Sequence, residues 1–168
     1  MTRRTLLLAM VLLSGCASGG AAPAAMTPEH SAAIRDSVTA TLEQYRAAFA
    51  ARNIDGVLRF YSDDPRFRWV EDGELRYESK AAVAKALRAF TPSLRAVELS
   101  YFDPVVTVLA PGVAVVATRF AQKITDSTGV TRGFAGAMSM TLVHADSGWR
   151  FLMGHTSSVV PQEGDATK

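Results

Sequence analysis

The sequence predicts a single α+β domain in which helices come first and a long antiparallel sheet follows. Three observations lead to this prediction. Apolar residues recur at helical spacing after residue 27, an Asp-Gly turn joins two short extended segments, and from residue 94 onward long strand-like runs alternate with turn-forming residues. A chain of 168 residues fits one domain. Helices followed by strands, rather than alternating with them, indicate helices packed on one face of the sheet.

The first helix is predicted from its start signal and its apolar stripe. Thr27 is a suitable N-cap, Pro28 fits the first turn, and Glu29 places an acid at the positive end of the helix dipole. The stripe has steps of three and four residues, which puts its members on one buried face. They are Ile34, Val38, Leu42, Tyr45 and Phe49.

Two shorter helices and a hairpin are expected before the long sheet. Asn53 is a candidate cap for a short second helix, and Ser79 for a third. Between them, residues 67–70 and 75–77 are extended segments, and Asp72-Gly73 is a strong hairpin signal. Asp63 and Asp64 precede Pro65, where such residues usually cap and form turns.

Four long runs predict the strands of the sheet. They span residues 95–109, 113–125, 130–144 and 149–159, and turn residues separate them at 111–112, 127–129 and 146–148. Asp103-Pro104 interrupts the first run, which predicts a bend or bulge. Long strands joined by tight turns make a strongly curved antiparallel meander.

The N-terminal residues predict export and a lipid anchor. Residues 1–16 combine Arg3 and Arg4 with a short apolar run, as signal peptides do, and the run is too short to span a bilayer. Leu13-Ser14-Gly15-Cys16 resembles a bacterial lipobox, which implies a lipidated Cys16 as the new N-terminus. Cys16 is the only cysteine, so an internal disulfide is excluded. With Ala17 following, the expected destination is the outer membrane, facing the periplasm, if the host is Gram-negative.

The domain itself is expected to span residues 27–161. Residues 17–26 are small and flexible in composition and predict a tether, and residues 162–168 predict a frayed tail. Of the 18 basic residues, Arg3 and Arg4 leave with the signal, so the 16 that remain balance the 16 acidic ones. A near-neutral domain gives no electrostatic reason to expect nucleic acid as a partner.

Strand alternation predicts which side chains face the concave side of the sheet. The more apolar face of residues 130–143 includes Met140, and a two-residue loop at 147–148 places Met140 opposite His155. The predicted inner surface is apolar with a few polar groups, which is the general form of a small-molecule pocket. Its candidate lining residues are Tyr45, Tyr61, Trp69, Thr118, Gln122, Arg132, Met140 and Ser157, with His155 as the candidate catalytic residue.

His155 and the two tryptophans each have a structural alternative. His155 could act as an acid or base near neutral pH, or it could be a core histidine bonded to a neighbouring hydroxyl. Trp149 follows a turn and heads an apolar run, which favours packing, whereas Trp69 fits either a pocket wall or hairpin packing. The three histidines lie far apart, without metal-site spacing, and no phosphate-binding glycine loop follows a strand. Neither a metal nor a cofactor is therefore expected.

The order of elements, with LRFYSDDPRF, the Asp72-Gly73 turn and GWRFLMGHTS, resembles the nuclear-transport-factor-2-like superfamily over residues 30–160. Within it, the chain is most similar to SnoaL-like and calcium/calmodulin-kinase-association-like bacterial domains. The resemblance implies a cone-shaped fold with a pocket at the open end. It also implies that the general-base position of ketosteroid isomerase falls at about Trp69, which has no carboxylate, so that chemistry is not expected.

Three functions remain open on the sequence alone, because this fold carries many activities. The first is binding of a small apolar or amphipathic molecule by a lipid-anchored envelope protein. The second is an isomerase, dehydratase or cyclase reaction with His155 as acid or base. The third is a ligand-free interaction domain that forms a homodimer through the open face of its sheet.

Overall fold

The computed structural model describes residues 26–159. The predicted signal peptide, Cys16, nearly all of the tether and the tail at 162–168 lie outside the described residues. Helices α1 (Pro28–Ala50) and α2 (Ile54–Leu58) come first, followed by strands β1 (Arg68–Glu71) and β2 (Glu74–Tyr77). Helix α3 (Lys80–Phe90) and a 3-10 turn, η1 (Thr91–Ser93), lead into the long strands. These are β3 (Leu94–Ala110), β4 (Val113–Asp126), β5 (Thr131–Ala145) and β6 (Gly148–Ser158).

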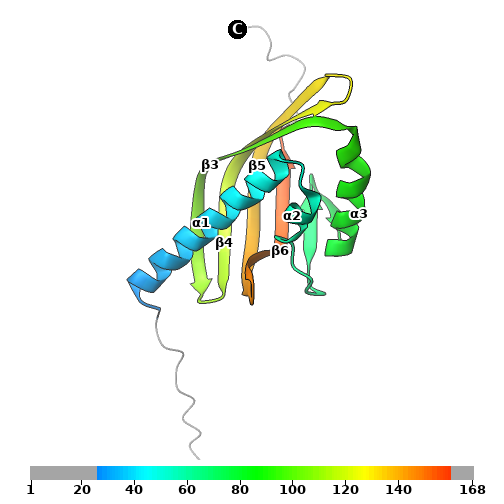
Figure 1. The fold of residues 1–168 in the computed structure, drawn as a ribbon. Coiled ribbons are helices and arrows are strands. Elements are labelled where there is room, and N and C mark those ends of the chain that lie inside the picture. The colour runs from blue at the N-terminus through cyan, green and yellow to red at the C-terminus, as the bar shows by residue number, and fades with distance from the viewer. Residues whose placement is uncertain (1–25, 160–168) are drawn as a thin grey trace, which may run out of the picture.

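The six strands form one curved sheet in the order β2-β1-β6-β5-β4-β3. Figure 1 shows α1 lying diagonally across one face of this sheet, with α3 beyond its β6 side. The α+β prediction is confirmed. One pairing differs from the predicted all-antiparallel sheet, because β1 pairs with β6 in parallel, Arg68 opposite Met153. Docking the β1–β2 hairpin there covers the edge of the last strand, which would otherwise offer unpaired backbone groups.

Helix α1 forms where the sequence predicted it and buries the predicted stripe, except that Phe49 is only partly buried. The Thr27 hydroxyl accepts a hydrogen bond from the His30 amide at 3.2 Å, and Ile34, Val38 and Leu42 are buried against the sheet. Full burial of such a side chain stabilises the fold by about 1.5–3 kcal/mol. Tyr45 continues the same stripe, so the helix aims its phenol ring at the interior.

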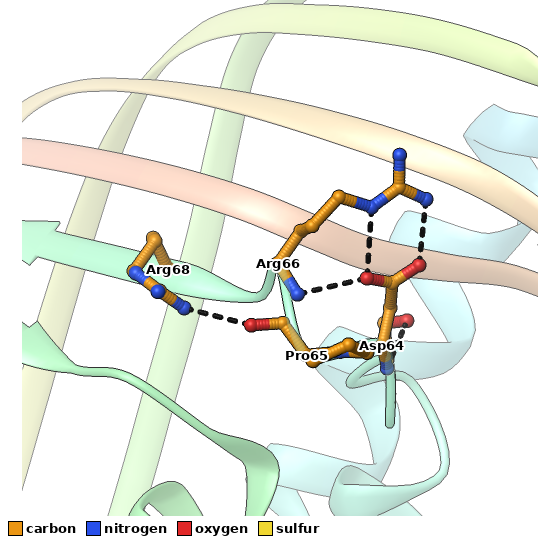
Figure 2. Close-up of polar contacts among 5 residues, drawn as sticks. Asp64, Pro65, Arg66 and Arg68 are labelled. Atoms are coloured by element: carbon orange, nitrogen blue, oxygen red, sulfur yellow. Dashed lines mark hydrogen bonds and ion pairs between the residues drawn. The ribbon is translucent and has the colours of Figure 1, made fainter.

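Side-chain caps and an ion-paired turn fix the short elements between α1 and β3. Asn53 caps α2 and Ser79 caps α3 by accepting from backbone amides at 2.9 Å and 3.2 Å, as predicted. Figure 2 shows the turn that leads into β1, where the Asp64 carboxylate accepts from the backbone and guanidinium of Arg66. These bonds lower the pKa of Asp64 to about 2. The turn-forming role expected of Asp64 is confirmed.

The helices of residues 26–159 pack on the inner face of the sheet and not on its outer face. Side chains of the helices and of the inner face form one core, which includes Val57, Phe67, Leu142 and Phe151. Trp149 belongs to it, as predicted, with 3% of its surface exposed and its indole nitrogen donating to Ser37 on α1 at 3.2 Å. The helices of the described part all lie on the inner side. Within residues 26–159, no helix has the length and apolar character needed to traverse a bilayer.

Candidate functional site

A cavity of ≈ 200 Å³ lies between the helices and the inner face of the sheet. Side chains from α1, α3, the β1–β2 hairpin and strands β3–β6 enclose it, so elements far apart in the sequence meet there. Its walls are largely apolar and aromatic, with a small set of polar groups among them. The polar groups are Tyr45, Tyr61, Glu71, Tyr77, Tyr101, Gln122 and Thr156.

Two buried tyrosines form the centre of this polar set. Tyr45 comes from α1, and Tyr61 follows α2, where a bridge to Phe151 of β6 fixes the backbone. Their hydroxyl oxygens lie 2.8 Å apart. Burial raises the pKa of Tyr45 to about 12 and also raises the pKa of Tyr61 well above its ordinary value, so both phenols stay protonated. Because one hydroxyl donates to the other, the second keeps its own proton free for another acceptor.

Tyr101 adds a third phenol from β3, and its hydroxyl is buried without a hydrogen-bond partner in the part of the chain that the structure describes. Burial, followed by the nearby Tyr45, raises the pKa of Tyr101 well above its ordinary value. A buried donor left unpaired costs about 1–3 kcal/mol. Native proteins pair the large majority of such groups, so an unpaired one needs a reason. A ligand atom that accepts this hydrogen bond is such a reason.

Glu71 supplies a carboxyl group to the same cavity from the end of β1. Its Oε1 accepts from the indole nitrogen of Trp69 at 3.1 Å, and the Arg76 Nε lies 3.7 Å from its Oε2. Desolvation raises the pKa of Glu71 despite both contacts, which act in the opposite direction. A carboxyl group with a raised pKa in a cavity is the kind of group that transfers protons.

Trp69 can occupy its place in the wall because Gly154 has no side chain. A Cβ at Gly154 would overlap Cζ3 of the Trp69 ring. The ring packs edge-on against Tyr61 and Phe151. Trp69 therefore serves both roles that the sequence left open, since it lines the cavity and anchors the hairpin to β6.

Five of the predicted pocket residues line the cavity: Tyr45, Tyr61, Trp69, Gln122 and Met140. Two others do not. Thr118 is buried, but its hydroxyl lies 3.0 Å from the carbonyl oxygen of Phe102 and 2.8 Å from that of Arg119, both of which are backbone acceptors. Arg132 lies at the start of β5, next to the turn between β4 and β5, and its side chain is exposed outside the cavity.

The predicted inward orientation of His155 and Ser157 is wrong. Both are exposed and line an open groove on the outer face of the sheet, beside Ala117 and Ser139. His155 pairs with Ser139, not Met140. The alternative of a buried, hydrogen-bonded core histidine is excluded by the same exposure.

A bulge in β6 is the physical cause of this reversal. Thr141 pairs with Met153 and Leu142 with Phe151, which leaves Leu152 without a partner. One extra residue turns every later side chain to the other face. Trp149 and Phe151 face inward as predicted, but beyond the bulge Thr156 faces the cavity in place of His155. The bulge lies where β6 changes edge partners, from Phe60 and Ser62 to β1.

Sequence reasoning missed Glu71, Tyr77, Tyr101 and Thr156. The inward position of Tyr101 could have been predicted, because Tyr101 continues the alternation of buried Val97 and Leu99 along β3. Glu71 stood beside the Asp72-Gly73 turn, where a charged residue normally indicates solvent. Among residues 26–159 there is no cluster of histidine, cysteine and acidic side chains that could hold a metal ion.

Comparisons with solved structures show the same fold at low sequence identity. A proposed scytalone dehydratase from Novosphingobium aromaticivorans has a TM-score of 0.74 and 10% identity, covering 80% of this chain and 89% of its own. A nuclear-transport-factor-2-like superfamily protein from Salmonella enterica has a TM-score of 0.68 and 13% identity, covering 82% and 98%. A ketosteroid isomerase-like protein from Erwinia carotovora has a TM-score of 0.61 and 22% identity, covering 80% and 100%.

The sequence itself identifies the family. No curated protein matches the chain at a significant level. The model of the SnoaL-like domain matches residues 38–161, which includes every strand of the sheet and most of α1. Together with a curved six-stranded sheet and N-terminal helices, this match shows that the chain belongs to the SnoaL-like domain family, within the nuclear-transport-factor-2-like fold.

Proposed function

We propose that the domain binds a small, largely apolar molecule that carries an oxygen acceptor, in the cavity between the helices and the sheet. The observation that carries this proposal is the buried hydroxyl of Tyr101, which has no hydrogen-bond partner among residues 26–159. Tyr45 and Tyr61 place two further hydroxyl groups in the same cavity. A carbonyl or hydroxyl oxygen of the ligand accepts the free phenol protons, and the apolar walls hold the rest.

The test measures binding of small ketones, such as cyclohexanone and acetophenone, by calorimetry. The protein is the full chain carrying Cys16→Ser, which removes the residue expected to carry lipid. Tyr101→Phe keeps the ring but removes the donor, and one neutral hydrogen bond of about 1–1.5 kcal/mol corresponds to roughly tenfold weaker binding. His155→Ala is the matched control, since His155 lies outside the cavity. Equal binding by wild type and Tyr101→Phe would contradict the proposal.

A second candidate function, acid–base catalysis, is favoured by Glu71. Its carboxyl group lies in the cavity wall, and desolvation raises its pKa. Solved structures of this fold are named for a dehydratase and for a ketosteroid isomerase-like protein. In this candidate Glu71, not His155, accepts a proton from the carbon next to a ligand carbonyl, and a phenol donates a hydrogen bond to the carbonyl oxygen. The carboxyl group then returns the proton to a different atom.

Deuterium exchange tests the catalytic candidate without knowledge of the substrate. In heavy water, the wild type should speed deuterium incorporation next to the carbonyl of a bound ketone, as followed by NMR. Glu71→Gln should abolish this acceleration while leaving ketone affinity within a few-fold. No acceleration by the wild type would remove the catalytic candidate and leave the binding function in place.

We also propose that the domain is exported and anchored by lipid on Cys16, because Leu13-Ser14-Gly15-Cys16 resembles a lipobox. Metabolic labelling of a bacterial host with an alkyne-bearing palmitate tests this. The wild type should incorporate the label and fractionate with membranes. Cys16→Ser should do neither, and an unlabelled wild type would contradict the proposal.

A further inference from the structure

The cavity is too small to enclose a typical ligand. Pockets that bury drug-sized molecules usually measure about 300–1,000 Å³, and this cavity measures ≈ 200 Å³. Either the ligand is very small or part of it projects through the mouth. The character of the mouth separates these alternatives.

Exposure increases from the phenol end of the cavity toward two phenylalanines. Tyr45 and Tyr61 expose 7% and 5% of their surface, whereas Phe90 and Phe134 expose 47% and 37% and line the same cavity. Phe90 ends α3 and Phe134 lies in the first half of β5, so the two come from different elements. The polar groups are therefore deep, and the rim is apolar.

A pocket that fully encloses an apolar ligand would have apolar groups inside and a polar rim. This cavity has polar groups inside and an apolar rim. Large apolar side chains exposed together at a cavity mouth indicate that something apolar covers them. A ligand whose tail passes over Phe90 and Phe134 would cover them. Its polar head would then lie at the buried hydroxyl groups.

The charges of the lining restrict the head group. Among the described residues that line the cavity, none is lysine or arginine, and the one acidic side chain is Glu71. A carboxylate or phosphate head would be buried without a cation and beside a carboxyl group, which is costly. An uncharged oxygen acceptor matches the phenol donors without this cost.

We infer that the cavity takes an uncharged single-chain amphiphile head first, with its oxygen at Tyr61 and Tyr101 and its alkyl chain leaving past Phe90 and Phe134. The inference rests on the proposed binding function and adds the class of ligand and its direction of entry. A long-chain ketone, aldehyde or alcohol has this chemistry. A fatty acid anion does not.

Straight-chain methyl ketones from butanone upward, lengthened by one methylene at a time, test the inference. Calorimetry measures their dissociation constants for the full chain carrying Cys16→Ser. Burial of one methylene adds about fourfold in affinity. We expect this gain to continue into the longer ketones, after the cavity is filled, because the added methylenes lie against the rim. Alkyl carboxylates of matched length should bind at least tenfold more weakly.

Variants separate the contribution of the two rim phenylalanines from that of the Tyr101 hydroxyl. Phe134→Ser and, on a different element, Phe90→Ser should reduce the gain per methylene for long ketones and leave short ketones unchanged. Tyr101→Phe should weaken all ketones by one common factor. Leu109→Ser is the matched control, because Leu109 is exposed on β3 and does not line the cavity.

The outcomes distinguish this inference from the proposed function. If short ketones bind but the gain stops with them, and neither rim variant has an effect, the inference is overturned and the binding function stands. Tighter binding of the carboxylates would overturn the inference in the same way. If ketones of every length fail to bind, both are overturned.

Discussion

Tyr101 combines a cost to stability with a proposed benefit to binding. Its hydroxyl is buried and has no partner among the described residues, whereas the hydroxyls of Tyr45 and Tyr61 share a hydrogen bond of 2.8 Å. Residues that serve binding are often held at some expense to the fold. In the empty cavity, the hydroxyls of Tyr45 and Tyr61 therefore contribute a hydrogen bond to stability, whereas the hydroxyl of Tyr101 lowers stability.

Tyr101→Phe should stabilise the ligand-free protein. Removing an unpaired buried hydroxyl while keeping the ring recovers part of its desolvation cost, an expected gain of about 1 kcal/mol. Tyr61→Phe should instead lower stability by a similar amount, since it leaves Tyr45 without a partner. Urea unfolding of both variants measures this contrast. Loss of stability in Tyr101→Phe would show that the hydroxyl is satisfied after all.

Glu71 should make stability depend on pH in a direction set by its burial. Desolvation raises its pKa, so the folded protein holds this proton more tightly than the unfolded chain. The favourable contribution is complete below the ordinary carboxyl pKa and is lost as pH rises through the raised pKa. Glu71→Gln should therefore be more stable than wild type at neutral pH, and the difference should shrink in acid. Melting temperatures of both proteins across pH check this, and a difference independent of pH would contradict it.

At the scale of elements, β6 determines which side chains reach the cavity. Its first residues follow the alternation that the sequence predicts, and the bulge at Leu152 then reverses the rest. No residue type at Leu152 signals the bulge, because its cause is a change of edge partner along β6. This is why the inward placement of Met140 could be predicted and that of Thr156 could not.

Gly154 should be required for the contact between β6 and the hairpin. Gly154→Ala forces a Cβ into the Trp69 ring, and overpacking of this kind costs about 1–3 kcal/mol. Trp69→Leu should relieve most of that cost, giving a coupling of about 1–2 kcal/mol in a double-mutant cycle measured by urea unfolding. Gly136→Ala is the control, because its Cβ would meet the backbone oxygen of Ser157, which Trp69→Leu cannot relieve. Additive losses for Gly154→Ala and Trp69→Leu would contradict this account.

At the scale of the whole molecule, periodicity, caps and turn signals were enough to predict the fold class and each α-helix and strand of residues 26–159, although not the 3-10 turn η1. Thr27, Asn53 and Ser79 cap the helices they were expected to cap, because these signals depend only on neighbours in sequence. The parallel pairing of β1 with β6 and the entry of Glu71 into the cavity depend on contacts between distant segments. A single sequence does not encode such contacts in any local pattern.

The described helices leave the outer face of the sheet uncovered. Phe102, Val105 and Met153 are exposed there, and small residues at Ala117 and Ala137 leave the strands open to close approach. Arg119 and Asp103 form an ion pair 3.1 Å long on the same face. A surface with both apolar groups and both signs of charge can complement itself across a two-fold axis.

We therefore expect the protein to form a homodimer through this face. Ala137→Arg places a long charged side chain on this face in both copies and should yield monomers. Ala33→Arg makes the same change on the exposed side of α1 and should leave the dimer intact. Light scattering coupled to size exclusion measures the mass of all three proteins over a range of concentrations. A wild type that is monomeric throughout, or an Ala137→Arg variant that still dimerises, would show that the face is simply solvated sheet.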